Sequence, residues 1–314
     1  MKLPLFVLIG FGWLFAAPLV LDAKIERTVD KTFTVQPGGT LRIETSGGGI
    51  KVEPGAGNTV AIHVKQRIEA STDAEADALL KSLTLTFEQQ GNDVTAIAKY
   101  EGERTFSWFH WGSWPPVQVE FTVTVPATYN VNLRTSGGGI TVGDLIGRVE
   151  VWTSGGGLHF GKITGTVEGH TSGGGIRLDA CTGDVNLHTS GGGINLGPVS
   201  GNAEVHTSGG PISIQGIAGT VKGHTSGGGI DVAFSGPLKG NCDLSTSGGG
   251  ITVKVDPKSD FDIDAHTSGG GVHTKLSVTV QGEVGNGKLV GRVNAGGHLL
   301  KLRSSGGSID IDAD

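Results

Sequence analysis

TSGGGITVGDLIGRVEVW, residues 135–152, is the first of five consecutive 18-residue units in this chain. The next four units read TSGGGLHFGKITGTVEGH, TSGGGIRLDACTGDVNLH, TSGGGINLGPVSGNAEVH and TSGGPISIQGIAGTVKGH. Outside these units the opening motif recurs at Thr45, Thr225, Thr246 and Thr267, and a degenerate copy begins at Ser304. A repeat of fixed length is typical of proteins that stack one structural unit on the next.

Each unit alternates apolar and polar residues in two places. Positions 6 and 8 are apolar, as Ile140 and Val142 illustrate, and the residue between them is polar. Positions 15 and 17 repeat the pattern with Val149 and Val151, and position 13 is Gly in all five units. A period of two residues is that of a strand with one buried face, so each unit is predicted to contain two strands joined by glycine-rich turns.

Such a unit cannot bury its apolar face alone, but it can do so on copies of itself. We therefore predict an all-β fold, a parallel β-solenoid whose coils of 18–21 residues are each about 4.8 Å thick. Two apolar pairs per unit favour two sheets, and a three-sided β-helix is the alternative. A calcium-binding repeat is disfavoured, because no acidic residue stands at the required offset after the glycines.

The TSGGG motif is expected to turn the chain sharply at the same place in every coil. Glycine permits positive φ angles and lets neighbouring backbones approach closely. The hydroxyl groups of the preceding Thr and Ser are expected to bond to their equivalents in the coils above and below.

Residues 24–134 depart from the repeat. The segment LRIETSGGGIKV (41–52) nearly matches VNLRTSGGGITV (131–142), so the first is expected to form the first coil and to pair with the second. The residues between them are then a strand-rich insertion that caps the N-terminal end. One short helix is expected at 71–83, where the T-x-x-E spacing is that of a capping box.

The two ends of the chain carry separate predictions. Residues 1–23 are predicted to be a signal peptide, because Lys2 precedes a long apolar run and Ala23 suits cleavage. The alternative is a run that is kept as an anchor, and only then is contact with a membrane expected. Residues 135–314 are expected to form the solenoid, with 287–314 as its last coil and C-terminal cap.

Two stretches resemble a known family. They are the V-P-x-x-x-x-V-x-L-x-T-S-G-G-G entry from Val125 to Gly139 and the closing VNAGGHLLKLRSSGGSI (293–309). Both are similar to the bacterial "putative adhesin" β-strand-repeat domains of unknown function. The resemblance implies an exported or envelope-associated β-solenoid, and it brings no catalytic residues.

Position 18 of the units holds the most unusual chemistry, a column of histidines that face outward. Neighbouring coils would place these rings about one strand spacing apart, and neutral imidazoles so placed could share Zn²⁺ or Cu²⁺. The favoured interpretation is a solvated ladder without metal, because a straight column offers poor tetrahedral geometry. The residues of the column are His170, His188, His206 and His224, with His266 as a further candidate.

A second candidate site is the aromatic stretch TFSWFHWGSWPP (105–116). Its Trp108, Phe109, Trp111 and Trp114 are candidates for binding a glycan, a lipid headgroup or a protein partner. The alternative is that they pack over the end of the stack as a cap.

The remaining reactive residues predict no catalytic or cofactor site. Cys181 and Cys242 would lie three coils apart, too far for a disulfide, so both are expected to be free and buried. The acidic clusters at 179–184 and 260–264 have no facing partner that would make a catalytic pair.

We therefore predict a non-enzymatic, exported binding or scaffold module located in the periplasm, on the cell surface or outside the cell. The net charge of −6 without a basic run argues against nucleic acid as a partner. A polysaccharide-cleaving β-helix and an ice-binding solenoid are the alternative functions.

Overall fold

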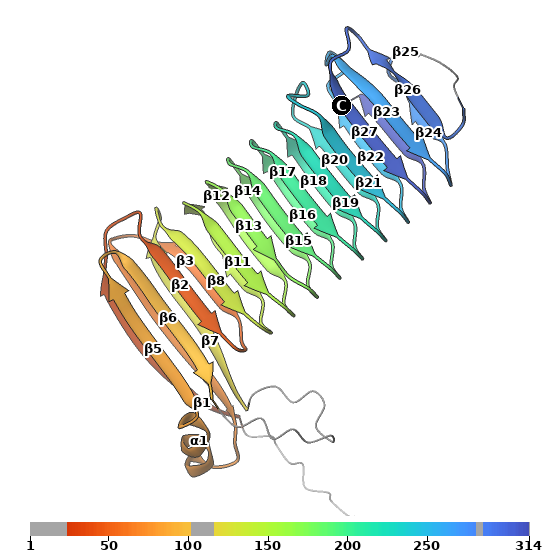
Figure 1. Cartoon of the computed structure of the whole chain (residues 1–314). Coiled ribbons are helices and arrows are strands. Elements are labelled where there is room, and N and C mark those ends of the chain that lie inside the picture. Colours follow the sequence, from red (N-terminus) through yellow and green to blue (C-terminus); the bar gives the residue numbers. More distant parts are fainter. Residues whose placement is uncertain (1–23, 102–115, 281–284, 314) are drawn as a thin grey trace, which may run out of the picture.

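The computed structural model describes residues 24–101, 116–280 and 285–313 of the chain. These residues form a long stack of strands in two sheets, with one short helix, α1 (Asp73–Leu80), near the N-terminal end (Figure 1). None of the helices in this described part is long and apolar enough to cross a membrane.

The two sheets face each other along the stack, with the buried side chains between them. The first sheet has the order β1 (Lys24–Thr34), β4 (Thr59–Glu69), β7 (Val117–Pro126), β3 (Ile50–Gly55), β9 (Ile140–Val142), β12 (Leu158–Thr164), β14 (Ile176–Cys181), β16 (Ile194–Val199), β18 (Ile212–Ile217), β20 (Ile230–Phe234), β22 (Ile251–Val255), β28 (Ile309–Ala313) and β24 (Val272–Thr274), and β10 (Leu145–Ile146) pairs with β12. The second sheet has the order β25 (Val278–Val280), β26 (Lys288–Val293), β23 (Phe261–Thr267), β27 (His298–Ser304), β21 (Cys242–Thr246), β19 (Val221–Thr225), β17 (Ala203–Thr207), β15 (Val185–Thr189), β13 (Val167–His170), β11 (Val149–Thr153), β8 (Asn130–Thr135), β2 (Thr40–Thr45), β6 (Asp93–Tyr100) and β5 (Leu83–Gln90).

The repeat sets the register of the stack. Ile140 pairs with Leu158, Leu158 with Ile176, and Ile176 with Ile194, each in parallel and one unit apart. All four side chains are buried between the sheets, as are the apolar residues of positions 8, 15 and 17 in these units, apart from glycines. The predicted parallel β-solenoid is confirmed, with two sheets and not three sides.

The threonine of the motif holds successive coils together, but not in the expected way. Its hydroxyl donates to the carbonyl of the second motif glycine in the neighbouring coil, as from Thr207 to Gly192 at 2.7 Å. Ser304 and the motif threonines of the other coils make the same kind of bond, except Thr45, whose hydroxyl donates to the Gly47 carbonyl of its own motif at 2.8 Å. The expectation that hydroxyls bond to one another was wrong, because each hydroxyl is within hydrogen-bond distance of a backbone carbonyl in the adjacent turn and donates to it.

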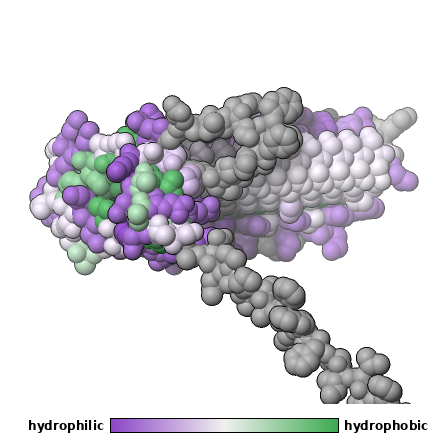
Figure 2. All heavy atoms as spheres, turned by 90° about the horizontal axis from the view of Figure 1, so that it is seen from below, coloured by the Kyte–Doolittle hydropathy of each residue, from purple (hydrophilic) through white to green (hydrophobic). Residues whose placement is uncertain are grey.

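The second motif glycine is required by space. A methyl group at Gly174 would lie 2.3 Å from the Gly156 carbonyl oxygen of the next coil. Among the described second glycines only Gly48 has a positive φ, +91°. Close approach of backbones therefore selects glycine here, and positive φ, which the sequence also suggested, does so only in the first coil. On the side seen in Figure 2, rows of nearly white residues, which have intermediate hydropathy, run along the repeats.

Both sheets continue past the first coil into the N-terminal segment. Strands β2 and β3 pair with β8 and β9, and the inserted strands β6 and β7 add to the other side of β2 and β3. The insertion therefore extends the stack by strand pairing. In helix α1, Thr72 accepts a bond from the Glu75 amide at 3.2 Å, and the Glu75 carboxylate accepts one from the Ser71 amide at 2.9 Å.

Of residues 287–314 only β26 lies at the end of the stack, so the expectation that this whole stretch forms the last coil is corrected for β27 and β28. Strand β27 lies between β21 and β23, and β28 lies between β22 and β24. The chain first builds the end of the stack with β23 to β26 and then returns into the layer beneath. This is possible because SSGGSI (304–309) keeps the register of the motif. The Ser304 hydroxyl donates to the Gly249 carbonyl of one neighbouring coil, and the Gly307 carbonyl accepts from the Thr267 hydroxyl of the other.

Cys181 and Cys242 are free and buried, as predicted. They lie in different sheets, on β14 and β21. Burial raises the pKa of both thiols, so neither is disposed to form a thiolate.

Candidate binding groove

The outward residue just before each motif threonine forms a straight column on the second sheet. Alternation within each strand sends its two neighbours into the core and this residue out of it. The pairing of β8, β11, β13, β15, β17, β19 and β21 then aligns one such residue per coil. We call this set the position-18 column, and its members are Arg134, Trp152, His170, His188, His206, His224 and Ser245.

The rings of this column stack on one another. The His188 and His206 centroids are 4.9 Å apart with planes 3° from parallel, and those of His206 and His224 are 4.9 Å apart at 11°. Trp152 lies parallel to His170 at 5.9 Å, whereas His170 and His188 are tilted by 36°. Stacking covers the faces of the inner rings, so the column presents ring edges and nitrogen atoms outward.

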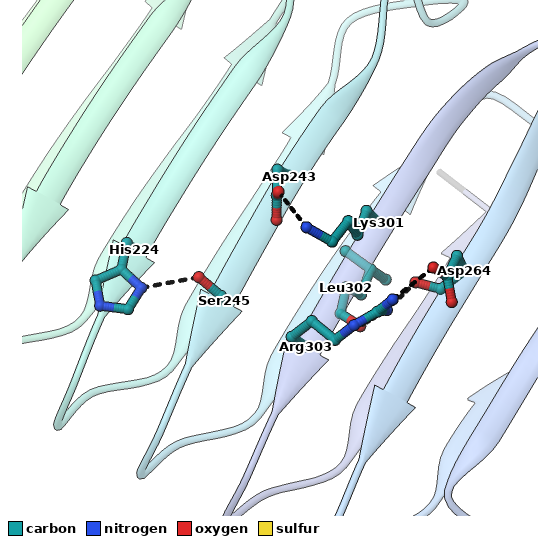
Figure 3. Close-up of polar contacts among 7 residues, drawn as sticks. All are labelled: His224, Asp243, Ser245, Asp264, Lys301, Leu302 and Arg303. Carbon is teal, nitrogen blue, oxygen red and sulfur yellow. Dashed lines mark hydrogen bonds and ion pairs between the residues drawn. The ribbon is translucent and has the colours of Figure 1, made fainter.

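The two ends of the ring stack are polar. The Arg134 guanidinium lies 4.5 Å from the centre of a Trp152 ring, a cation–π contact that fixes both side chains. At the other end, Nδ1 of His224 is hydrogen bonded to Ser245 Oγ at 2.8 Å (Figure 3). In the middle, burial and then the neighbouring His188 and His224 lower the pKa of His206.

A groove with a volume of about 580 Å³ lies along the first part of this column. Residues from the column, from the adjacent TSGGG turns and from strands β2 and β6 line it. The lining side chains that carry charge or hydrogen-bonding groups are Glu44, Lys99, Arg134, Trp152, His170, His188 and the motif serines Ser46, Ser136, Ser154, Ser172 and Ser190. We call this feature the column groove.

Two of the three charged side chains of the column groove, Glu44 and Lys99, are paired with an opposite charge, and Arg134 is not. Arg42 forms an ion pair with Glu44 on the same strand, and Lys99 lies 3.5 Å from Glu101. No ion pair joins Arg134 to a carboxylate within the described ranges. The motif serines are exposed, so their hydroxyl groups are open to a ligand.

Past Ser245 the second sheet carries an ion-pair network. Lys301 lies 2.7 Å from Asp243, and Arg303 lies 2.5 Å from Asp264 and donates to the Leu302 and Asp264 carbonyls (Figure 3). Burial opposes ionisation of Asp264, but Arg303 and His266 together lower its pKa.

The carboxylates noted in the sequence make separate local contacts. Asp260 accepts a bond from the Ala295 amide, and Asp262 pairs with Arg292 at 3.4 Å. Asp179 pairs with Arg177 at 3.0 Å on the first sheet. Asp184 accepts a bond from the Asn202 amide.

The other predicted sites have different outcomes. Trp108, Phe109, Trp111 and Trp114 lie outside the described residues, so their binding role stays a prediction. Over the parts of the chain that are described, no group of three or more His, Cys, Asp or Glu side chains is placed to hold a metal ion. The favoured interpretation of the histidines, a solvated ladder without metal, stays a prediction.

Sequence reasoning missed the most informative part of the groove. The column expected from the sequence contained histidines alone and left out Trp152 and Arg134. Their shared position 18 could have revealed both. Lys99 gave no such signal, because β6 reaches the groove by pairing of inserted strands that follow no repeat.

Several solved structures share low identity with this chain. A "putative lipid binding protein" from Parabacteroides distasonis ATCC 8503 is 14% identical over 90% of this chain and 96% of its own, with a TM-score of 0.44. The "putative adhesin" of Parabacteroides merdae ATCC 43184 is 10% identical over 91% and 96%, with a TM-score of 0.43. That of Bacteroides fragilis NCTC 9343 is 12% identical over 92% and 97%, with a TM-score of 0.33. These scores are too low to carry an argument.

The curated proteins include none that matches this sequence. The profile of the family described as Toastrack DUF4097 matches residues 39–312, which is most of the chain. Its span begins just before the first coil and ends within β28, so it takes in the repeats and the insertion. The protein belongs to the Toastrack DUF4097 family.

Proposed function

We propose that this protein is an exported, non-enzymatic binding module of the bacterial envelope, and that the column groove is its binding surface. One observation carries the proposal above the others. The groove lies where the column of histidines gives way to Trp152 and Arg134, and where Lys99 is added by the insertion. Different side chains thus meet there on an otherwise uniform stack.

The stack supports recognition by holding these side chains still. Trp152 is fixed between Arg134 and His170, and the backbone beneath belongs to paired strands. A surface that is ordered before binding loses little conformational entropy when the ligand arrives. A groove of this kind therefore suits an extended ligand that lies along the axis of the stack.

Export is proposed from the sequence of residues 1–23, whose apolar run follows Lys2. A periplasmic, surface-bound or secreted location is consistent with a chain that protects its two thiols by burial. The aromatic stretch 105–116 is proposed, on sequence alone, as a second contact with an envelope partner.

Binding of the purified protein to isolated envelope fractions tests the proposal. Arg134→Ala is expected to reduce the amount that cosediments, because it removes the exposed cation of the groove. Arg177→Ala is the matched control, since this arginine is also exposed but lies on the first sheet. Circular dichroism of both variants checks that the stack is intact. Equal retention of the two folded variants would contradict the assignment of the groove.

A further inference from the structure

The position-18 column limits which ligands the column groove can recognise. Each ring in the groove has a neighbour on both sides, since Trp152 lies between Arg134 and His170 and the His170 and His188 rings lie 5.9 to 6.0 Å from the preceding ring, with His206 4.9 Å beyond His188. A sugar ring or an aromatic side chain therefore cannot lie flat on them. What remains open is their edges, where imidazole nitrogens donate or accept hydrogen bonds. Recognition along the column must therefore use hydrogen bonds and charge.

The polar groups of the groove recur at the spacing of the coils. One motif serine and one position-18 side chain are presented per coil, from Ser136 beside Arg134 to Ser190 beside His188. Parallel strands in a sheet are about 4.8 Å apart. An extended glycan also repeats a hydroxyl-rich unit at a step of this order, whereas a peptide strand has side chains that alternate between two faces.

The charge of the groove favours an anion. Arg134 contributes positive charge and has no ion-pair partner within the described ranges, whereas Glu44 is paired with Arg42 and Lys99 lies 3.5 Å from Glu101. A further acid beside the column is Glu168, whose carboxylate lies 3.5 Å from Nε2 of His170.

We propose that the column groove binds a linear acidic polysaccharide, a polyuronate, which lies along the stack. Its carboxylates contact Arg134, Lys99 and the edges of His170 and His188, and its hydroxyl groups contact the motif serines. This inference rests on the binding function proposed above and names the class of its ligand.

Calorimetric titration of the purified protein with oligogalacturonate tests the inference. Saturable binding is expected. Arg134→Ala should weaken binding about tenfold or more, the usual effect of losing a hydrogen bond to a charged group. Arg177→Ala should bind as the unaltered protein does.

Three comparisons separate the possible failures. Equal affinity for the methyl-esterified, uncharged oligosaccharide would overturn the acidic class and leave the binding function standing. Equal affinity for poly-glutamate would overturn the glycan class in the same way. No binding to oligogalacturonate, together with envelope binding that still depends on Arg134, would overturn this inference alone. Loss of both would remove the proposed function as well.

Discussion

The bond from each motif threonine to the neighbouring turn predicts a measurable stability effect, and Thr207 is the best place to test it. Its side chain has no exposed surface, and its hydroxyl donates to the Gly192 carbonyl at 2.7 Å and accepts from the Gly210 amide at 3.4 Å. Thr207→Val keeps the shape of the side chain and removes both bonds.

The expected cost of Thr207→Val is about 1–3 kcal/mol, because a buried acceptor is left without its donor. Thr207→Ser keeps the hydroxyl and loses one methyl group, which costs about 0.8 kcal/mol. The chain itself shows that serine can serve, since Ser304 makes the equivalent bond to Gly249 at 2.8 Å. The valine variant should therefore be the less stable of the two.

Urea unfolding followed by circular dichroism measures the difference in free energy. In a stack whose units contact only their neighbours, part of the cost appears as local opening, so amide hydrogen exchange around Gly192 and Gly210 should be measured too. A valine variant that is as stable and as protected as the serine variant would show that methyl packing, and not the bond, selects threonine.

Three further predictions concern other features of the chain. Gly174→Ala places a methyl group 2.3 Å from the Gly156 carbonyl oxygen, so it should lower the free energy of unfolding by about 1–3 kcal/mol or more, whereas Gly285→Ala, where nothing lies within 4 Å, should be tolerated. Similar melting temperatures for the two variants would contradict the steric argument. Because the pKa of His206 is lowered in the folded state, the unfolded chain binds the proton more tightly, and stability should fall as pH drops below about 6.5. His206→Gln should flatten that part of the stability–pH curve. A slope that stays unchanged in this variant would contradict the contribution of His206. Deletion of 105–116 should weaken attachment to envelope fractions while leaving the melting temperature of the stack nearly unchanged, and full attachment would refute a binding role for that stretch.

Much of the fold could be predicted because the residues that form the core recur at the same positions of every repeat. The inward residues of each unit recur at fixed positions, so burying one unit requires another in register above it, as Ile140, Leu158 and Ile176 show. The column of histidines followed from the same period. The groove could be predicted only in part, since Lys99 and the turn serines meet Arg134 through pairing between segments far apart in the chain.

The sequence by itself determined the all-β stack and its outward columns, because a unit with this alternation and a fixed 18-residue period buries its apolar residues only against copies in register. The choice of two sheets over three sides was settled by the structure. Only the tertiary structure decided the order of the last layers, the carbonyl partner of each threonine and the glycine at each close approach. The physical reason is that a coil with the right pattern fits against any other such coil. Which coils become neighbours, and how closely their backbones approach, depends on the packing of the whole stack.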